Sequence, residues 1–453
     1  MKRLRELRAG SREAEKSFDF EAAAVRFGPR IAWVSIAIAT LAILTASCSD
    51  DVAGPADPPD ESNGRIDITN DEGTLDDRVN QEDTDVPIDP AAGSTQVMIP
   101  SSSMQAATAA LSLTLVSEIQ PPTVDGQVVQ ATSVSIQGSK VTASYNMRGA
   151  PRLGAIDLIL TSNLSRPRLT ASATFIDSDI SAIGSDAGYV YAAEATDAVG
   201  FEFPAALERL KIQNSKFTLD DNMRLPLTSY AATSAVAANS FIYATSGDGG
   251  HVFAFESSSM ELRGQYPLDD ARWAAWDREG GRLVVVQGTP GRISVFVEGE
   301  FPGGSMTLLN TFPFPGADVP ESKSTIEISG GKAFIAAGPE GVQVVCLDNG
   351  QVVGSVPRPD PAALGLDPSV VVTNAVTVDD DILFISNGEA GIYVARGAQD
   401  FDLTACTDQQ QITVLGKLQF DDLQSANHVD FKNSWLAVAA GLGGVKLVRV
   451  SGL

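Results

Sequence analysis

A four-residue turn bounded by two glycines recurs five times in the second half of this chain, each time between two apolar runs. The runs are short and rich in Val, Ile and Phe, as in LVVVQ before a turn and VKLVRV after one. Such residues fit a pleated, buried surface, and tight hairpins favour glycine because it adopts positive φ without a steric cost. The repeat therefore predicts copied β-hairpins, whose glycine pairs are Gly247/Gly250, Gly288/Gly291, Gly338/Gly341, Gly388/Gly391 and Gly441/Gly444.

The same glycines have a second interpretation, as loops that cradle a phosphate. Such a loop needs a helix directly after the glycines, so that the helix amino terminus faces the anion. In this chain a strand-like run follows each glycine pair. The context therefore favours the hairpin.

The spacing of the repeat predicts the architecture. With weaker copies at Gly154 and Gly200, the turns lie 46, 50, 41, 50, 50 and 53 residues apart, which is typical of four-stranded propeller blades. The repeats contain seven first strands but only six fourth strands, so one unit lacks its fourth strand. An unmatched strand, LTLVSEIQPP, precedes the repeats. We predict an all-β fold, a single seven-bladed β-propeller over residues 109–453, in which this amino-terminal strand completes the carboxy-terminal blade and removes open sheet edges. The best helix candidate, Pro204–Lys211, is expected to form one or two turns in a loop between strands.

The third strand and the turn before it carry a family resemblance. Segments such as AAGPEGVQVVCLD and AAGLGGVKLVRV resemble the LVIVD-repeat family, over the repeats from about residue 130 to the end. The terminal Asp of the family motif is kept only as Asp348. The resemblance implies an exported bacterial β-propeller lipoprotein at the surface or in the periplasm. The family has no established common activity, so the resemblance implies no reaction.

The amino terminus has the pattern of an export signal. An apolar run, Ile31–Ala46, follows Arg26 and Arg30 and precedes Cys48. The run is shorter than the roughly 20 residues of a spanning helix, and basic, apolar and small residues in this order are typical of a secretory signal. The box LTASC resembles a lipoprotein cleavage site, although its Leu lies one place early. We predict a signal peptide over residues 1–47 and a lipidated Cys48; an ordinary cleaved signal and a retained anchor are the alternatives.

The first 24 residues contain five acidic residues, which is unusual for a signal peptide. We hypothesise that translation starts near Val25. Sequencing the unprocessed precursor tests this, and a precursor that begins at Met1 would contradict it.

Residues 48–108 are predicted to be a disordered acidic tether. Up to about residue 97 they hold 14 acidic residues against Arg65 and Arg78. A segment rich in Pro, Gly and acidic residues buries too little apolar surface to fold. It is either a plain spacer or, behind a lipidated cysteine, a surface-export signal.

The net charge limits the classes of possible partner, and the cysteines allow a disulfide. Without residues 1–47 the chain has 24 basic and 52 acidic residues, a net charge of −28. This disfavours nucleic acid and anionic lipid, which need basic patches. An exported protein permits a disulfide between Cys346 and Cys406; two separate buried thiols are the alternative.

Signals of chemistry are few. The chain has two histidines, His251 and His428, and no motif for a serine nucleophile, zinc or a nucleotide. Asp recurs in the connections after fourth strands, which in propellers lie with the glycine turns around one channel mouth. Asp suits turns and a lone histidine is usually structural, while Trp273 and Trp276 are either core or binding rim. The candidate ligand residues are Asp179, Asp270, Asp318, Asp422 and His428.

Together these patterns predict a monomeric, lipid-anchored propeller of the bacterial outer membrane, facing the periplasm or the surface. It would bind an envelope protein or a glycan, contact the membrane only through its lipid, and need no cofactor. The alternative is an exported hydrolase or lactonase that binds calcium at the acidic mouth through oxygen ligands. The absence of a catalytic motif favours binding over catalysis.

Overall fold

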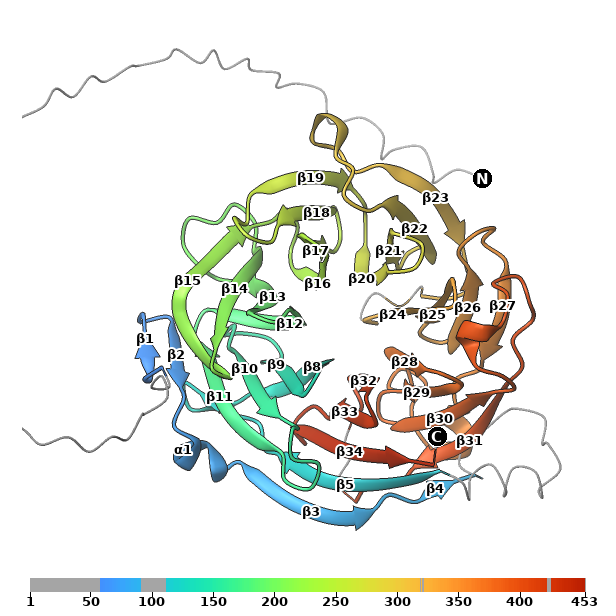
Figure 1. The fold of residues 1–453 in the computed structure, drawn as a ribbon, viewed down its shortest axis with the longest axis horizontal. Helices are drawn as coiled ribbons and strands as arrows, with labels where there is room; N and C mark the ends of the chain where they lie inside the picture. The colour runs from blue at the N-terminus through green and yellow to red at the C-terminus, as the bar shows by residue number, and fades with distance from the viewer. Residues whose placement is uncertain (1–57, 91–110, 318, 320–321, 422–424, 453) are drawn as a thin grey trace, which may run out of the picture. The chain divides into compact units, whose positions relative to one another are not determined.

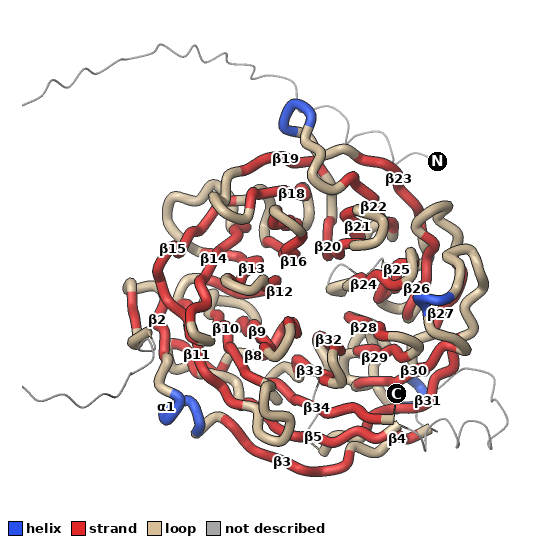
Figure 2. The backbone as a smooth tube through the Cα atoms, viewed as in Figure 1, coloured by secondary structure: helices blue, strands red, loops and turns tan. Residues whose placement is uncertain are grey.

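The strands of this chain form a closed ring of small sheets. A computed structural model describes residues 58–90, 111–317, 319, 322–421 and 425–452. Within them, seven antiparallel sheets surround a central axis as a seven-bladed β-propeller (Figure 1), and helix is confined to a few short turns (Figure 2). The predicted fold class is confirmed.

Each blade has four strands, which run outward in chain order in six blades, whereas the outer strand of the seventh comes from before the repeats. The inner strands are β8 (Gln130–Gln137), β12 (Ser178–Ser185), β16 (Ala232–Ala238), β20 (Ala271–Asp277), β24 (Ile326–Ser329), β28 (Ala375–Asp379) and β32 (His428–Lys432). The second strands are β9 (Lys140–Asn146), β13 (Tyr189–Thr196), β17 (Phe241–Ser246), β21 (Arg282–Gln287), β25 (Lys332–Ala336), β29 (Ile382–Ser386) and β33 (Trp435–Ala439). The third strands are β10 (Gly154–Leu160), β14 (Ala205–Gln213), β18 (His251–Glu256), β22 (Arg292–Val297), β26 (Val342–Cys346), β30 (Ile392–Gly397) and β34 (Val445–Ser451). The fourth strands are β11 (Arg168–Phe175), β15 (Lys216–Pro226), β19 (Leu262–Pro267), β23 (Leu308–Pro313), β27 (Val352–Val356), β31 (Ile412–Leu418) and β5 (Ser112–Ile119).

Short elements fill the connections. They are the ribbon β6 (Thr123–Val124) and β7 (Gln127–Val128), the helix α3 (Pro361–Leu364), and the 3₁₀ turns η1 (Pro302–Gly304) and η2 (Phe401–Leu403).

The ring closes by pairing the two ends of the repeat region. β5 lies antiparallel to β34, in a register that runs from Ser112 opposite Ser451 to Ile119 opposite Val445. The unmatched amino-terminal strand therefore completes the last blade, as predicted. Blade 1 begins at β8 and blade 7 begins at β32.

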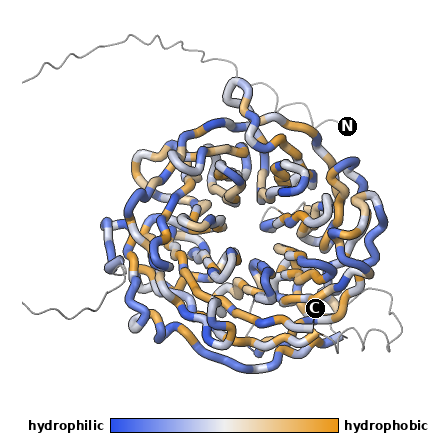
Figure 3. The backbone as a smooth tube through the Cα atoms, in the orientation of Figure 1, coloured by the Kyte–Doolittle hydropathy of each residue, from blue (hydrophilic) through white to orange (hydrophobic). Residues whose placement is uncertain are grey.

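The core is divided among the blade interfaces. Seven apolar clusters are found among the described residues, and each lies between two neighbouring blades. The cluster between blades 7 and 1, for example, packs Ala437 and Leu447 against Val134 and Tyr145. Apolar stretches follow the strands inside the ring, whereas the outermost segment along β3 is hydrophilic (Figure 3). Every blade is thus stabilised by burial on both of its faces.

The glycine turns join the second and third strands of their blades, and glycine is needed in them for more than one reason. Gly388 and Gly391 have φ of 60° and 85°, which favours glycine as predicted. Gly247, Gly250, Gly288 and Gly291 are not at positive φ, so the prediction is wrong for them. At Gly250 and Gly291 a Cβ would lie 2.3 Å from a main-chain oxygen, so glycine is required there by close packing.

The predicted helix over Pro204–Lys211 is wrong. This segment belongs to β14, which pairs with β13 on one side and β15 on the other. A strand in the middle of a blade is buried on both faces, and this context overrides the helical preference of AALERLK.

The predicted disorder of residues 48–108 is also wrong for the described part of that range. Residues 58–90, here called the belt, form β1 (Glu61–Ser62), β2 (Ile66–Thr69), α1 (Glu72–Asp76), β3 (Val79–Asp85) and β4 (Ile88–Asp89). The belt runs around the outside of the ring (Figure 1). β2 pairs with β11 of blade 1, β3 with β5 of blade 7 and β4 with β31 of blade 6.

Other predictions for the amino terminus concern residues outside the described ranges. These include the signal peptide, Cys48, and residues 48–57 and 91–108 of the predicted tether. Among the residues that are described, no helix is both long and apolar enough to cross a membrane.

The belt folds because its few apolar side chains reach the blade interfaces. Ile66 and Ile68 alternate along β2 and join the cluster between blades 1 and 2. Leu75 joins the cluster between blades 7 and 1, and Val86 joins the one between blades 6 and 7. The average composition of the segment conceals these four anchors.

Arg78 ties the belt to the closing seam of the ring. Its guanidinium donates to Asp157 Oδ1 and Oδ2 of blade 1 at 3.1 and 2.5 Å, and to the carbonyl oxygen of Gln120, just after β5, at 3.0 and 2.8 Å. The Asp157 side chain is fully buried and also accepts a hydrogen bond from the Tyr145 hydroxyl at 2.7 Å. Arg78 therefore neutralises a buried carboxylate while joining blades 7 and 1.

Arg65 has the same role one interface further along. It pairs with the fully buried Glu208 of blade 2, which lies near a second buried carboxyl, Glu194. Arg224 donates to Glu194 Oε1 at 2.6 Å and to Asp177 Oδ2 at 3.0 Å. Two guanidinium groups thus face three carboxyls, and burial together with Glu208 raises the pKa of Glu194 to about 8.

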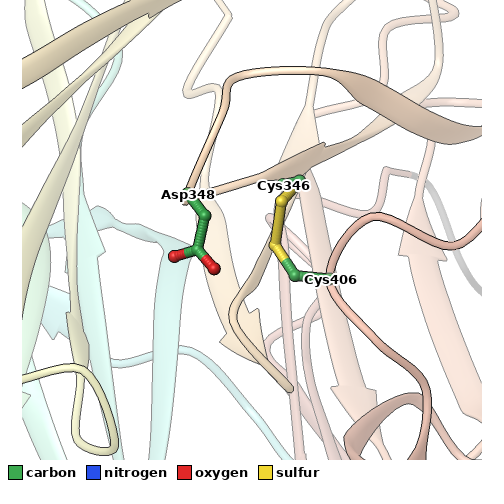
Figure 4. A group of neighbouring side chains, drawn as sticks. All are labelled: Cys346, Asp348 and Cys406. Atoms are coloured by element: carbon green, nitrogen blue, oxygen red, sulfur yellow. A yellow bond between two sulfur atoms is a disulfide. The ribbon is translucent and has the colours of Figure 1, made fainter.

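The predicted disulfide is present. Cys346, at the end of β26, is bonded to Cys406 in the connection between β30 and β31, with the two Cα atoms 5.1 Å apart (Figure 4). The bond links blades 5 and 6. The two cysteines are therefore not separate thiols.

Replacing Arg78 with methionine should destabilise the fold by about 3 kcal/mol, because it leaves the carboxylate of Asp157 buried without a cation. Urea unfolding would measure the change. Arg168→Met is the matched control: its ion pair with Glu72 is exposed, so its effect should stay below about 1 kcal/mol.

Adding Asp157→Asn to the Arg78→Met variant should restore part of the lost stability, since it removes the unpaired charge. Equal unfolding free energies for Arg78→Met and Arg168→Met would contradict the role given to Arg78.

Candidate functional site

The inner strands position the walls of a central channel. Neighbouring inner strands are joined by polar side chains that bond to the main chain of the next blade. Thr132 donates to the Ile180 carbonyl at 2.9 Å, Ser234 accepts from the Ala274 amide at 3.0 Å, and Thr377 accepts from the Phe431 amide at 3.0 Å. The polar positions of the inner strands therefore fix the geometry of the channel.

Three side chains meet inside the channel and are here called the plug: Trp273, His428 and Lys323. The rings of Trp273 on β20 and His428 on β32 pack with centroids 5.0 Å apart. Lys323 Nζ, from the connection between blades 4 and 5, donates to the carbonyl oxygens of Thr132 and Ser181 at 2.5 and 3.0 Å. The plug thus connects blades 4 and 7, and blade 5 with blades 1 and 2.

Cavities lie on both sides of Trp273, which lines each of them. The upper cavity, at the end where the inner strands begin, has a volume of about 760 Å³. Its wall is made by the glycine turns and by the connections between blades, as the sequence predicted for that mouth. The lining residues include Asn146, Ser181, Thr233, Asp248, Asp269, Asp270, Arg272, Thr289, Ser322 and Lys323.

Arg272 organises the wall of the upper cavity. Its buried guanidinium pairs with both oxygens of Asp270, at 3.0 and 2.9 Å. It also donates to the carbonyl oxygens of Val319 and Ser322, at 2.9 and 3.3 Å. Arg272 therefore holds the connection that carries Lys323 into the channel.

The floor of the upper cavity carries a titratable amine, that of Lys323. Although part of its side chain faces the cavity, the Lys323 ammonium lies deep in the channel, and burial lowers its pKa to about 7. Of the three buried lysines in the described residues, Lys216 pairs with Glu72 and Lys446 with Glu118, whereas Lys332 donates to the carbonyl oxygens of Gly330 and Thr404. Among the described residues, no carboxylate lies within ion-pair distance of Lys323.

The lower cavity, of about 540 Å³, has its own charged group. Lys432 Nζ lies 3.4 Å from Asp430 Oδ1 and 3.9 Å from Glu327 Oε1. Burial, offset in part by Lys432, raises the pKa of Glu327 to about 7, and the Asp430 charge raises the pKa of Lys432. Asp430 and Glu327 also accept main-chain amides, from Ile136 at 2.6 Å and Val378 at 2.9 Å. These charges are therefore engaged in joining blades.

The structure does not gather the five predicted ligand residues in one place. Asp270 lines the upper cavity, but Arg272 and the Thr289 amide occupy its oxygens. Asp179 accepts the Met147 amide at 3.2 Å, and burial raises its pKa to about 6. His428 lines the lower cavity, where it accepts from the Val134 amide at 3.4 Å. Asp318 and Asp422 lie outside the described residues.

Other aspartates in the connections after fourth strands serve the fold. Asp360 caps α3 by accepting the Ala362 amide at 3.0 Å, and Asp177 binds Arg224. Sequence reasoning missed Lys323, which shares its connection with Asp318. No local signal distinguishes it from a solvent-exposed lysine, because only the ring places it in the channel.

Within the described part of the chain, one group brings three potential ligand atoms together, namely those of Cys346, Asp348 and Cys406 (Figure 4). Its sulfurs are joined in a disulfide, whereas a metal needs thiolates. This group therefore does not fit a metal ion.

Neither histidine is part of a catalytic constellation in the described residues. His251 Nδ1 lies 2.8 Å from the Thr228 hydroxyl, and the ring packs on Phe253. No described carboxylate hydrogen-bonds to either imidazole, as the third member of a nucleophile–base–acid triad would.

The two histidines should titrate differently. Burial and the charges of Lys323 and Lys432 lower the pKa of His428 to about 3, while burial lowers that of His251 more modestly. Histidine-selective NMR should show one ring that titrates below pH 6.5 and one that stays neutral at pH 4.5. His251→Gln should remove the first signal.

A ring of His428 that becomes protonated near pH 6 would contradict the enclosed plug. The folded pKa of His428 lies below the unfolded value, so this histidine takes up a proton on unfolding. The stability of the fold should therefore decrease as pH falls below about 6.5.

Comparison with known proteins adds little beyond the fold. No protein-family profile and no curated protein matches the chain. Among solved structures it is similar to the computationally designed Ika8 protein, with 12% identity, a TM-score of 0.44, and coverage of 82% of this chain and 100% of that one. It is also similar to the WD40 β-propeller domain of Doa1, with 11% identity, a TM-score of 0.47, and coverage of 73% and 96%. BamB from Moraxella catarrhalis has 11% identity, a TM-score of 0.45, and coverage of 74% and 97%.

Proposed function

We propose that this chain is a binding protein of the bacterial cell envelope, whose partner, an envelope protein or a glycan, enters the upper cavity. The observation that carries the proposal is that cavity: about 760 Å³, walled by turns and connections of several blades and underlain by the plug. Its volume lies in the range of ligand sites. The seven-bladed propeller fits an interaction role because its rigid ring presents these connections on one face.

The lack of a catalytic arrangement among the described residues favours binding over catalysis. The hydrogen bonds of His251 and His428 go to Thr228 and to a main-chain amide. The carboxylates of Asp430 and Glu327 on the inner strands are engaged in joining blades. A chain with these features is suited to hold a ligand.

The envelope location is proposed from the sequence. The apolar run before LTASC, the export-permitted disulfide and the LVIVD-like repeats support a lipid at Cys48. The belt changes the reach of such an anchor, because 12 residues separate Cys48 from β1 at Glu61. Fully extended, they span roughly 45 Å. An anchored ring would therefore stay close to the membrane.

Cys48→Ala should release the protein from the membrane fraction of the producing bacterium and abolish its labelling by radioactive palmitate. Ser47→Ala is the matched control, since a small residue before the cysteine is kept, and it should stay anchored. Membrane retention of Cys48→Ala, with no label in the parent protein, would contradict the lipid anchor.

A photo-crosslinking residue in place of Thr289, which lines the upper cavity, should capture a partner in intact cells. The same residue in place of Gln137, which lines the lower cavity, should not. Gel shifts detected with an antibody would measure the adducts. Adducts from the Gln137 position alone, or the same adducts from both, would contradict the upper cavity as the binding site.

A further inference from the structure

The upper cavity carries separate charges on different walls. Lys323 Nζ is bonded to carbonyl oxygens on the side of blades 1 and 2. Asp248, in a glycine turn of blade 3, and Asp269, after β19, line the same cavity. In the described part of the chain, no lysine or arginine lies within ion-pair distance of Asp248 or Asp269. The cavity is therefore dipolar.

The Lys323 ammonium at the floor of the upper cavity can bind an anionic group when it is protonated. A Lys ammonium presents three donors, and two of those of Lys323 are used by Thr132 and Ser181. Enclosing a charge without a counter-ion is costly, so an anionic group that enters the cavity would gain a charge-assisted hydrogen bond. Trp273 lies beside this position and offers an apolar face.

The wall that carries Asp248 and Asp269 can bind a cationic group. Asp269 uses one oxygen, Oδ1, to accept the Gly249 amide at 2.7 Å. Asp248 is exposed, and the Ser229 hydroxyl donates to its main-chain oxygen at 2.7 Å, which leaves its carboxylate oxygens outside that bond. Asp270 differs, because Arg272 already neutralises it. Asp248 and Asp269 are thus available to a positively charged group.

We propose that the upper cavity binds the carboxy-terminal end of a peptide that ends in a basic residue. The terminal carboxylate accepts a hydrogen bond from Lys323, the basic side chain faces Asp248 and Asp269, and its aliphatic stem packs on Trp273. Asn146, which also lines the cavity, is placed to bond the peptide main chain. This inference rests on the proposed binding function and specifies its ligand.

Because Lys323 and the two aspartates have opposite charges, a ligand that carries both signs suits the cavity better than a simple anion or a simple cation. The net charge of the chain disfavours anions at long range, and the Lys323 floor disfavours cations at short range. A peptide end brings both signs at a fixed separation. The cavity volume exceeds what a single ion needs and suits a drug-sized ligand.

Calorimetric titration of the purified protein with acetyl-Ala-Ala-Lys tests the proposal. The free acid should bind at least 10-fold more tightly than its carboxamide and than acetyl-Ala-Ala-Ala. Lys323→Met should remove the preference for the acid over the amide. Asp248→Asn combined with Asp269→Asn should remove the preference for Lys over Ala.

Lys140→Met is the matched control. The Lys140 ammonium also donates to a main-chain carbonyl, that of Ala187 at 3.5 Å, but lies where β8 turns into β9 at the other face. This variant should keep both preferences. Equal binding of acid and amide by the unmodified protein would overturn the proposal even if Lys323→Met fails to fold, and so would equal losses in Lys323→Met and Lys140→Met.

The result separates this inference from the proposed function. Adducts at Thr289 without peptide discrimination would show that the upper cavity binds a ligand of other chemistry, and would overturn only the peptide proposal. Discrimination lost specifically in Lys323→Met would support it.

Discussion

Arg78 joins the three parts of the chain that meet where the ring closes. It belongs to the belt, it binds the main chain just after β5, and it neutralises Asp157 in blade 1. A propeller without this contact would keep a carboxylate buried beside Tyr145 with no cation, at the interface that forms last along the sequence. The pairing of β5 with β34 closes the ring through its main chain, and Arg78 secures the same seam through side chains. The belt is therefore part of the fold.

The polar groups of the inner strands help to shape the upper cavity. Several of these strands direct side chains to the next blade, and these bonds fix the spacing around the axis. The plug then places Trp273 and Lys323 below the upper cavity. Arg272 holds the connection from which Lys323 extends. Charges in the cavity are thus positioned by the scaffold, with the turns supplying the rim.

Repetition made the propeller predictable, because seven weak signals with one spacing reinforce each other. The same averaging concealed what is not repeated. The composition of residues 48–108 predicted disorder, yet four apolar side chains and two arginines anchor the belt, since each meets a partner that the ring provides. The Asp pattern pointed to the mouth where the upper cavity lies, but Arg272 neutralises Asp270, and nothing in the sequence pointed to Lys323 in the channel. The place of Lys323 depends on contacts with blades 1 and 2, and the local sequence carries no sign of them.

Hydrogen exchange of the native protein, followed by mass spectrometry, tests the central claim most directly. The account predicts that main-chain amides of β2 and β3 exchange slowly, as those of β34 do, because they are paired with β11 and β5. Exchange of residues 58–90 at the rate of an unstructured peptide, with the blades still protected, would contradict the belt and the role of its arginines.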